Sequence, residues 1–180
     1  MLKVYNFKDL DENQANALCI RNVDENNSIK TVVEDILKDV KLNGDASLRA
    51  FAEKFDGIKI DKLFIGKNDI EQLAAGIGEK EKQALTLAFN NITKFHETQL
   101  GQEERIETTK GVICWREKRA IEKVGLYIPG GTAVLPSTFL MLGVPARLAG
   151  CREIVVCSPP QKDGKVNAYL AYCAHLLGIE

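Results

Sequence analysis

The chain has 180 residues, of which 45% are hydrophobic and 27% are charged, a composition typical of globular proteins. Its 24 basic and 25 acidic residues give a net charge of −1, which argues against partners such as nucleic acid or an anionic membrane surface. No apolar run is long enough to span a bilayer and the N-terminus lacks a signal-peptide pattern, so we expect a cytoplasmic protein.

The N-terminal part is predicted to be helical. Residues 1–27 form an arm with one short helix, Asp11–Arg21, followed by a polar break, Asn22–Asn27. Ser28 is the predicted N-cap of a second helix, because apolar residues follow it at helical spacing. These residues are Ile29, Val32, Val33, Ile36, Leu37 and Val40.

Glycines are expected to end the next elements. Asn43 and Gly44 end the second helix, and Asp45 caps a third, which stops near Asp56-Gly57. A short strand is predicted at Lys62–Gly66. A helix is predicted at Lys67–Ala75, and Gly76 and Gly78 separate it from a longer one.

The longer helix, Glu79–Leu100, is predicted to bury one apolar stripe. The stripe consists of Ala84, Leu85, Leu87, Ala88, Ile92 and Phe95. Arg105–Thr109 and Val112–Lys118 alternate around Gly111, which indicates a β-hairpin or two edge strands. Trp115 is expected to be a packing residue there.

A βαβ unit of a parallel sheet is predicted from residue 124 onward. The strand Val124–Ile128 leads into a turn at Pro129, Gly130 and Gly131. A helix of about Pro136–Ala149 follows, stopped by Gly150, and a second strand covers Ile154–Cys157. Ligands of such units bind where the strands' carboxyl ends meet the turns.

The glycine turn allows two interpretations. Glycines permit a sharp turn and close approach of a ligand, and Ser137 and Thr138 lie near a helix N-terminus that favours an anion. Tyr127 could stack on a planar ligand. The alternative is an ordinary tight turn beside a core tyrosine, since the motif is not G-x-G-x-x-G.

Groups suited to catalysis or metal binding are scarce. The two histidines, His96 and His175, have no ligand at metal-binding spacing and are interpreted as helix-surface residues. The number of cysteines is odd, and none forms C-x-x-C. Three of the five lie in apolar surroundings and are interpreted as buried free thiols. The cysteines are Cys19, Cys114, Cys151, Cys157 and Cys173.

A last helix, Val166–Leu177, is predicted to end at Gly178. Such a helix usually leads into the next parallel strand, so we expect the sequence to stop in the middle of a fold. The predicted fold class is α/β, with a helical N-terminal arm and partial Rossmann-like parallel sheets flanked by helices. We expect three parts: an arm at 1–27, the first part of an α/β domain at 28–123, and half of a Rossmann-like domain at 124–180.

Residues 124–160 carry a family resemblance. They read V-G-L-Y-I-P-G-G-T-A-V-L-P-S-T-F-L-M-L-G-V-P-A-R-L-A-G-C-R-E-I-V-V-C-S-P-P, which closely resembles histidinol dehydrogenase. Leu42–Asp45, Lys54–Gly57, and Ile92 with Phe95-His96 also look like that family's N-terminal half. The resemblance covers nearly the whole chain.

The resemblance implies an enzyme that oxidises L-histidinol to L-histidine in two NAD-dependent steps, with zinc to position the substrate and a Glu-His pair for acid–base chemistry. It implies a homodimer with Rossmann-like domains, and a contact between Tyr127 and NAD. The family's zinc ligands and catalytic pair map downstream of residue 180, so no catalytic or metal residue is assigned here. We expect the chain alone to be inactive; the alternative is a non-catalytic α/β module that binds NAD weakly at most.

Overall fold

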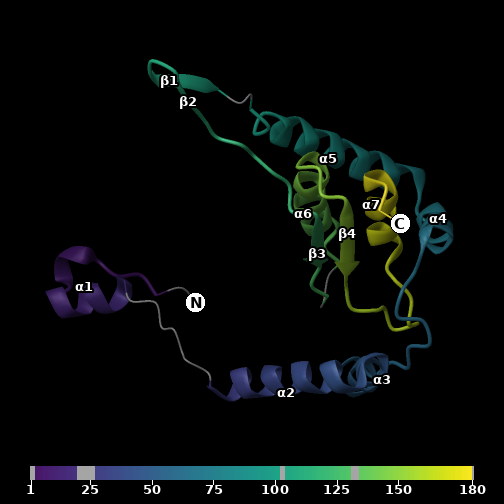
Figure 1. Ribbon diagram of the computed structural model, residues 1–180. Coiled ribbons are helices and arrows are strands. Elements are labelled where there is room, and N and C mark those ends of the chain that lie inside the picture. Colours follow the sequence, from purple (N-terminus) through teal and green to yellow (C-terminus); the bar gives the residue numbers. More distant parts are fainter. Residues whose placement is uncertain (1–2, 20–26, 102–103, 131–133, 180) are drawn as a thin grey trace. The chain divides into compact units, whose positions relative to one another are not determined.

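The computed structural model describes residues 3–19, 27–101, 104–130 and 134–179 (Figure 1). The chain divides into two compact units, Met1–Ser47 and Leu48–Glu180, which are considered separately. The predicted division of residues 1–180 into an arm and two partial domains stays a prediction. Within the described ranges, no helix has the length and apolar character needed to cross a membrane.

The first unit contains a 3-10 turn, Phe7–Asp9, and helices α1, Glu12–Cys19, and α2, Asn27–Asn43. Asp11 and Gln14 form a reciprocal cap at the start of α1, because each side chain accepts a hydrogen bond from the other's backbone N–H, at 2.8 and 3.1 Å. Residues 20–26, which include the end of the predicted first helix and most of the polar break, lie outside the described residues.

The second predicted helix is confirmed, but its start is not. α2 begins at Asn27, so Ser28 lies inside the helix and is not its N-cap. Gly44, with φ of 56°, separates α2 from α3, Asp45–Phe51, and Asp45 is the first helical residue, not the cap. A π-helical turn, Ala52–Asp56, continues α3 and ends at Gly57, with φ of 68°.

The predicted strand Lys62–Gly66 is wrong. The segment has no regular structure, and its end serves the next helix, α4, Lys67–Ala75. Asp69 accepts hydrogen bonds from the Gly66 backbone N–H at 3.2 Å and from the Lys62 ammonium, and so caps α4. The Lys62 bond is the main reason that the pKa of Asp69 is lowered, followed by the bond from Gly66.

Helix α5, Glu79–Glu97, is confirmed, but three of its predicted core residues are wrong. Leu87 and Phe95 are 61% and 65% exposed, and Ala84 is exposed as well. At 3.6 residues per turn, Leu87 lies about 200° around the helix from Leu85. The residues of α5 that pack against the core are Leu85, Ala88, Phe89 and Ile92.

The predicted hairpin is confirmed. Strands β1, Arg105–Thr109, and β2, Val112–Trp115, pair antiparallel around Gly111, whose φ is 84°. Both strands are exposed along their length, and Trp115 is not a core residue. Its ring lies 5.0 Å from the Arg105 guanidinium carbon, which indicates a cation–π contact.

The predicted βαβ unit is confirmed and forms the centre of the second unit. Strands β3, Lys123–Tyr127, and β4, Glu153–Cys157, pair in parallel, and α6, Pro136–Leu148, connects them. Helix α7, Ala168–Leu177, starts two residues later than predicted because Asn167 caps it by accepting from the Tyr169 N–H at 2.8 Å. Gly178 ends α7 in the left-handed conformation, as predicted.

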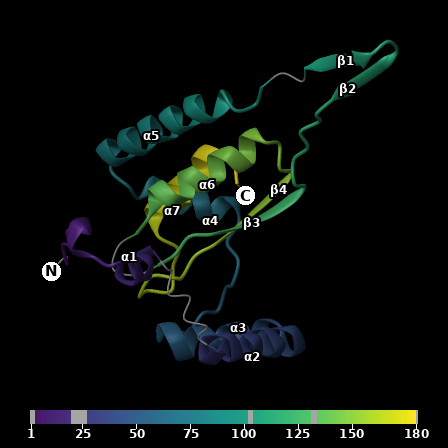
Figure 2. The same ribbon diagram turned by 90° about the vertical axis from the view of Figure 1, so that its left-hand side faces the viewer.

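The core lies between the helices and one face of the strands. Figure 2 shows α6 between α5 and the β3–β4 pair, and α7 packs on both α4 and α6. The fully buried side chains of this core are Ile128, Phe139, Leu140, Val144 and Cys173. The mixed α/β class is confirmed. Of the five cysteines, Cys151 and Cys173 are buried, and the expectation of a third buried thiol is wrong.

Candidate functional site

The carboxyl ends of β3 and β4 form one edge of the parallel pair. Tyr127 is directly opposite Cys157 in the register, and the Ile128 N–H donates to the Cys157 carbonyl at 2.8 Å. Side chains on a strand alternate between faces, so Leu126 and Ile128 enter the core and Tyr127 does not. The Tyr127 side chain is 62% exposed. The alternative of a core tyrosine is therefore wrong.

Tyr127 is available to a ligand at this edge. Among the described residues, no hydrogen bond reaches its hydroxyl and no aromatic ring stacks on it. An exposed aromatic ring at the end of a parallel strand suits a planar ligand, because such sheets bind ligands outside their carboxyl ends. The exposed ring is therefore the feature of Tyr127 to consider.

Gly130 is constrained by a neighbouring loop. Its φ is not in the left-handed region, yet a Cβ atom at this position would lie 2.9 Å from Cγ of Pro159. Real Cβ atoms essentially never approach another heavy atom so closely. A protein side chain thus lies close to Gly130 on the side where a Cβ would point. The expected approach of a ligand to this turn stays a prediction, and Gly131 lies outside the described residues.

The N-terminus of α6 follows the same edge. Pro136 occupies the first helical turn, as predicted, and Leu135 precedes it without a side-chain cap. Ser137 is exposed and Thr138 is half-buried. The residues predicted to favour an anion are thus present at the helix end, while no bond from either hydroxyl to the first turn is seen within the described ranges.

Neither histidine belongs to a group of metal ligands among the described residues. His96 contacts Gln99 through Nδ1 at 2.9 Å, and the exposed His175 stacks on Tyr172 with ring centroids 6.1 Å apart. In the part of the chain that the structure describes, no three His, Cys, Asp or Glu residues gather in a way that could hold a metal ion. These residues therefore do not fit a zinc site.

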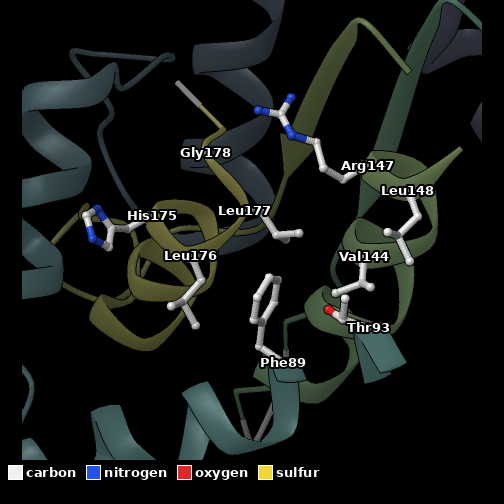
Figure 3. A pocket seen from close by; sticks show the side chains of 9 residues that line it. All are labelled: Phe89, Thr93, Val144, Arg147, Leu148, His175, Leu176, Leu177 and Gly178. Carbon is white, nitrogen blue, oxygen red and sulfur yellow. The ribbon is translucent and has the colours of Figure 1, made fainter. Parts of the chain in front are cut away.

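A hollow with a volume of about 390 Å³ lies between α5, α6 and α7 (Figure 3). Its walls are mostly apolar, with Arg147 and His175 as its basic residues. Thr93 also lines it, and the Thr93 hydroxyl is buried without a hydrogen-bond partner in the described structure. No sequence motif marks this hollow, because its walls come from three separate helices.

The edge with Tyr127 and the hollow between α5, α6 and α7 lie at opposite ends of the parallel strands. Helix α6 runs from the carboxyl end of β3 back to the amino end of β4, so its C-terminal half, with Val144 and Leu148, lies toward the amino ends. Ligands of α/β sheets bind at the carboxyl ends. The edge with Tyr127 is therefore the stronger candidate site.

The fold and this edge define an α/β protein with a βαβ unit of the kind found in nucleotide-binding domains. A family model described as histidinol dehydrogenase matches residues 19–180. The chain belongs to the histidinol dehydrogenase family.

Relatives agree with the family model. The chain is similar to the histidinol dehydrogenase of Vibrio cholerae, with 46% identity over 175 residues, which is 97% of this chain and 40% of that protein. It is 46% identical over 160 residues to the histidine biosynthesis trifunctional protein of Komagataella pastoris, covering 89% of this chain and 19% of that protein.

A solved structure supports the same fold. The crystal structure of histidinol dehydrogenase from Elizabethkingia anophelis matches with a TM-score of 0.84 and 39% identity, covering 94% of this chain and 39% of that chain. The chain thus spans about two fifths of the length of these bacterial relatives.

Proposed function

We propose that this chain is the N-terminal part of an NAD-dependent histidinol dehydrogenase, which oxidises L-histidinol to L-histidine in two steps during histidine biosynthesis. The observation that carries this proposal is the family match, which covers residues 19–180. The enzyme is proposed to be a cytoplasmic homodimer. NAD, when bound, supplies the hydride acceptor for both steps.

Tyr127 is the residue proposed to contact NAD. Its exposed ring, at the carboxyl end of β3, supports this role, since a planar ring of the cofactor can stack on it. The buried neighbours Leu126 and Ile128 hold the strand in place, so that the ring is presented at a fixed edge. Tyr127 is proposed to bind and orient the cofactor, and no proton transfer is assigned to it.

The acid–base groups and the zinc ligands are proposed to come from the part of the enzyme that follows residue 180. This assignment rests on the family resemblance, which maps these groups downstream of residue 180. No step that depends on zinc is therefore assigned to residues of this chain. The chain alone is proposed to be inactive, because the groups that accept and return protons are proposed to lie after residue 180.

A fusion protein tests the proposal. Residues 1–180 are joined to the downstream part of the Vibrio cholerae enzyme, and NADH formation is measured with L-histidinol. We expect the fusion to be active and the 180-residue chain to be inactive. NADH formation by the chain alone would contradict its proposed inactivity, and a folded fusion without activity would contradict the proposed reaction.

A titration tests the alternative of a non-catalytic NAD-binding module. NAD is added to the 180-residue chain, and binding is followed by calorimetry. Trp115 is a poor reporter because it lies on the exposed hairpin, beside Arg105. Binding by the chain together with an inactive fusion would favour the non-catalytic module.

A further inference from the structure

We propose that Pro159 is a positioning residue for the cofactor edge: its ring lies against Gly130 and fixes the backbone that follows Tyr127. This inference rests on the proposed function, in which Tyr127 contacts NAD. Neither Pro159 nor Gly130 is proposed to take part in the chemistry.

Among the described residues, backbone hydrogen bonds join the two strand ends as far as Ile128. The last of these bonds runs from the Ile128 N–H to the Cys157 carbonyl, at 2.8 Å. Ile128 is fully buried, so the strand is also fixed there by packing. Pro159 and Pro160 carry no N–H, so neither can donate a further hydrogen bond to β3. Side-chain packing is therefore a second means of setting the path of the backbone after Ile128.

Pro159 supplies that packing. The three heavy atoms nearest to a Cβ placed on Gly130 all belong to the Pro159 ring: Cγ at 2.9 Å, Cβ at 3.1 Å and Cδ at 3.4 Å. A proline ring is rigid because its φ is fixed, so it cannot swing away as a flexible side chain would. Gly130 is therefore required here by close packing, not by an unusual backbone angle.

The contact lies three residues after Tyr127 along the same backbone. Ser158, Pro159 and Pro160 are half-buried, which indicates that this loop is packed along its length. A displacement of Gly130 moves the chain at the point where it leaves the cofactor edge. Misplacement by about 1 Å can reduce the rate on the order of 100-fold in enzymes, so a smaller shift is expected to have a measurable effect on NAD binding.

The test uses the fusion enzyme with three variants. We expect G130A to raise the KM for NAD about tenfold, with kcat changed less than about twofold, because the shift acts on cofactor binding and not on the chemical groups. P159A should raise the same KM by about threefold, since the rigid wall is lost. In the double variant G130A/P159A the KM should lie closer to that of the parent than in G130A.

The expected recovery of the KM for NAD in the double variant follows from the distances between the Pro159 ring and a Cβ atom at Gly130. P159A removes the atoms that lie 2.9 and 3.4 Å from the position of the added methyl group and leaves one at 3.1 Å, which needs only a small adjustment. A merely structural contact would lower the melting temperature and the yield of active enzyme without changing KM. P160A is the matched control, because its ring is not among the atoms nearest to Gly130. We expect P160A to keep the parent KM.

Three results would overturn the inference. These are an unchanged KM in both single variants, a double variant no better than G130A, and a KM in P160A that rises as much as in P159A. If G130A does not fold, P159A and P160A still decide the question. Y127A separates this inference from the proposed function. An unchanged KM in Y127A contradicts the role of Tyr127, whereas a raised KM in Y127A with normal values in P159A and G130A contradicts only the role of Pro159.

Discussion

Gly143 on α6 lies against Leu177 on α7 so closely that a Cβ atom at Gly143 would be 2.5 Å from Cδ1 of Leu177. Both residues are buried. Glycine inside a helix ordinarily costs about 1 kcal/mol relative to alanine. Its presence here is explained by the close approach of the two helices.

G143A is expected to lower the free energy of unfolding by about 1 kcal/mol, because the end of the Leu177 side chain must move aside within the core and this cost outweighs the gain in helix propensity. Urea unfolding followed by circular dichroism measures the change. The variant L177V shortens the side chain that the added methyl group would meet. G143A should therefore lower the free energy of unfolding less in the L177V background than in the parent. An increase in stability on G143A alone would contradict the close packing of α6 and α7.

Two threonines of α5 allow a matched comparison. The Thr93 hydroxyl is buried without a partner in the described structure, while the Thr86 hydroxyl lies 3.1 Å from the Tyr172 hydroxyl. T93V is expected to be neutral or to stabilise by up to about 1 kcal/mol, because an unpaired buried hydroxyl is removed. T86V should destabilise by about 1 kcal/mol, because it leaves the tyrosine hydroxyl without its partner.

Thermal and urea unfolding of the two variants decide the comparison. Threonine and valine have similar shapes and are both β-branched, so helix propensity changes little. Equal destabilisation of T93V and T86V would show that the Thr93 hydroxyl is satisfied in solution.

Cys173 is predicted to be unreactive. It is fully buried, its Sγ lies 3.8 Å from the Pro136 carbonyl, and burial raises the pKa of its thiol from about 9 to about 12. The thiolate is the reactive form. In the native protein near neutral pH, an alkylating reagent should modify the exposed Cys114 and Cys157 well before Cys173. Peptide mapping by mass spectrometry measures this order, and early labelling of Cys173 would contradict it.

The same thiol predicts a loss of stability in alkali. A folded-state pKa above the unfolded value means that the contribution of Cys173 is complete below about pH 9 and is lost as the pH rises toward 12. The free energy of unfolding should therefore fall less steeply over this range in C173A than in the parent. If the free energy of unfolding fell equally steeply with pH in C173A and in the parent, the raised pKa of Cys173 would be contradicted.

Tyr127 is expected to act through its ring. In the fusion enzyme, Y127A should raise the KM for NAD about tenfold, while Y127F should change it little, because stacking remains when the hydroxyl is removed. Y169A is a control from another exposed tyrosine, on α7, and should keep the parent KM. A large effect of Y127F would show that the hydroxyl, not the ring, contacts the cofactor.

Local sequence signals were sufficient to predict most of the helices and the βαβ unit. Glycines at positions 44, 57, 111 and 178 take left-handed backbone angles at the element ends where they were expected to act. The two strands β3 and β4 and the length of α6 were likewise predicted from residue type. These features depend on neighbours in sequence, which is why the pattern of residues predicts them.

Features that depend on distant neighbours were missed. Leu87 and Phe95 are apolar but face away from α6 and α7, and the direction of burial on α5 follows from those helices. Lys62–Gly66 has strand-like residues, yet it is used to cap α4 through Asp69. The reason for Gly130, the ring of Pro159, is 29 positions away in the chain.

The measurement that tests the central claim most directly is the stoichiometry of the reaction. The fusion enzyme is incubated with L-histidinol and excess NAD, with L-histidine measured by mass spectrometry and NADH by absorbance. We predict that each L-histidine formed is accompanied by two NADH. Release of an aldehyde with one NADH, or no conversion by a folded fusion, would contradict the claim that this chain supplies the N-terminal part of a histidinol dehydrogenase.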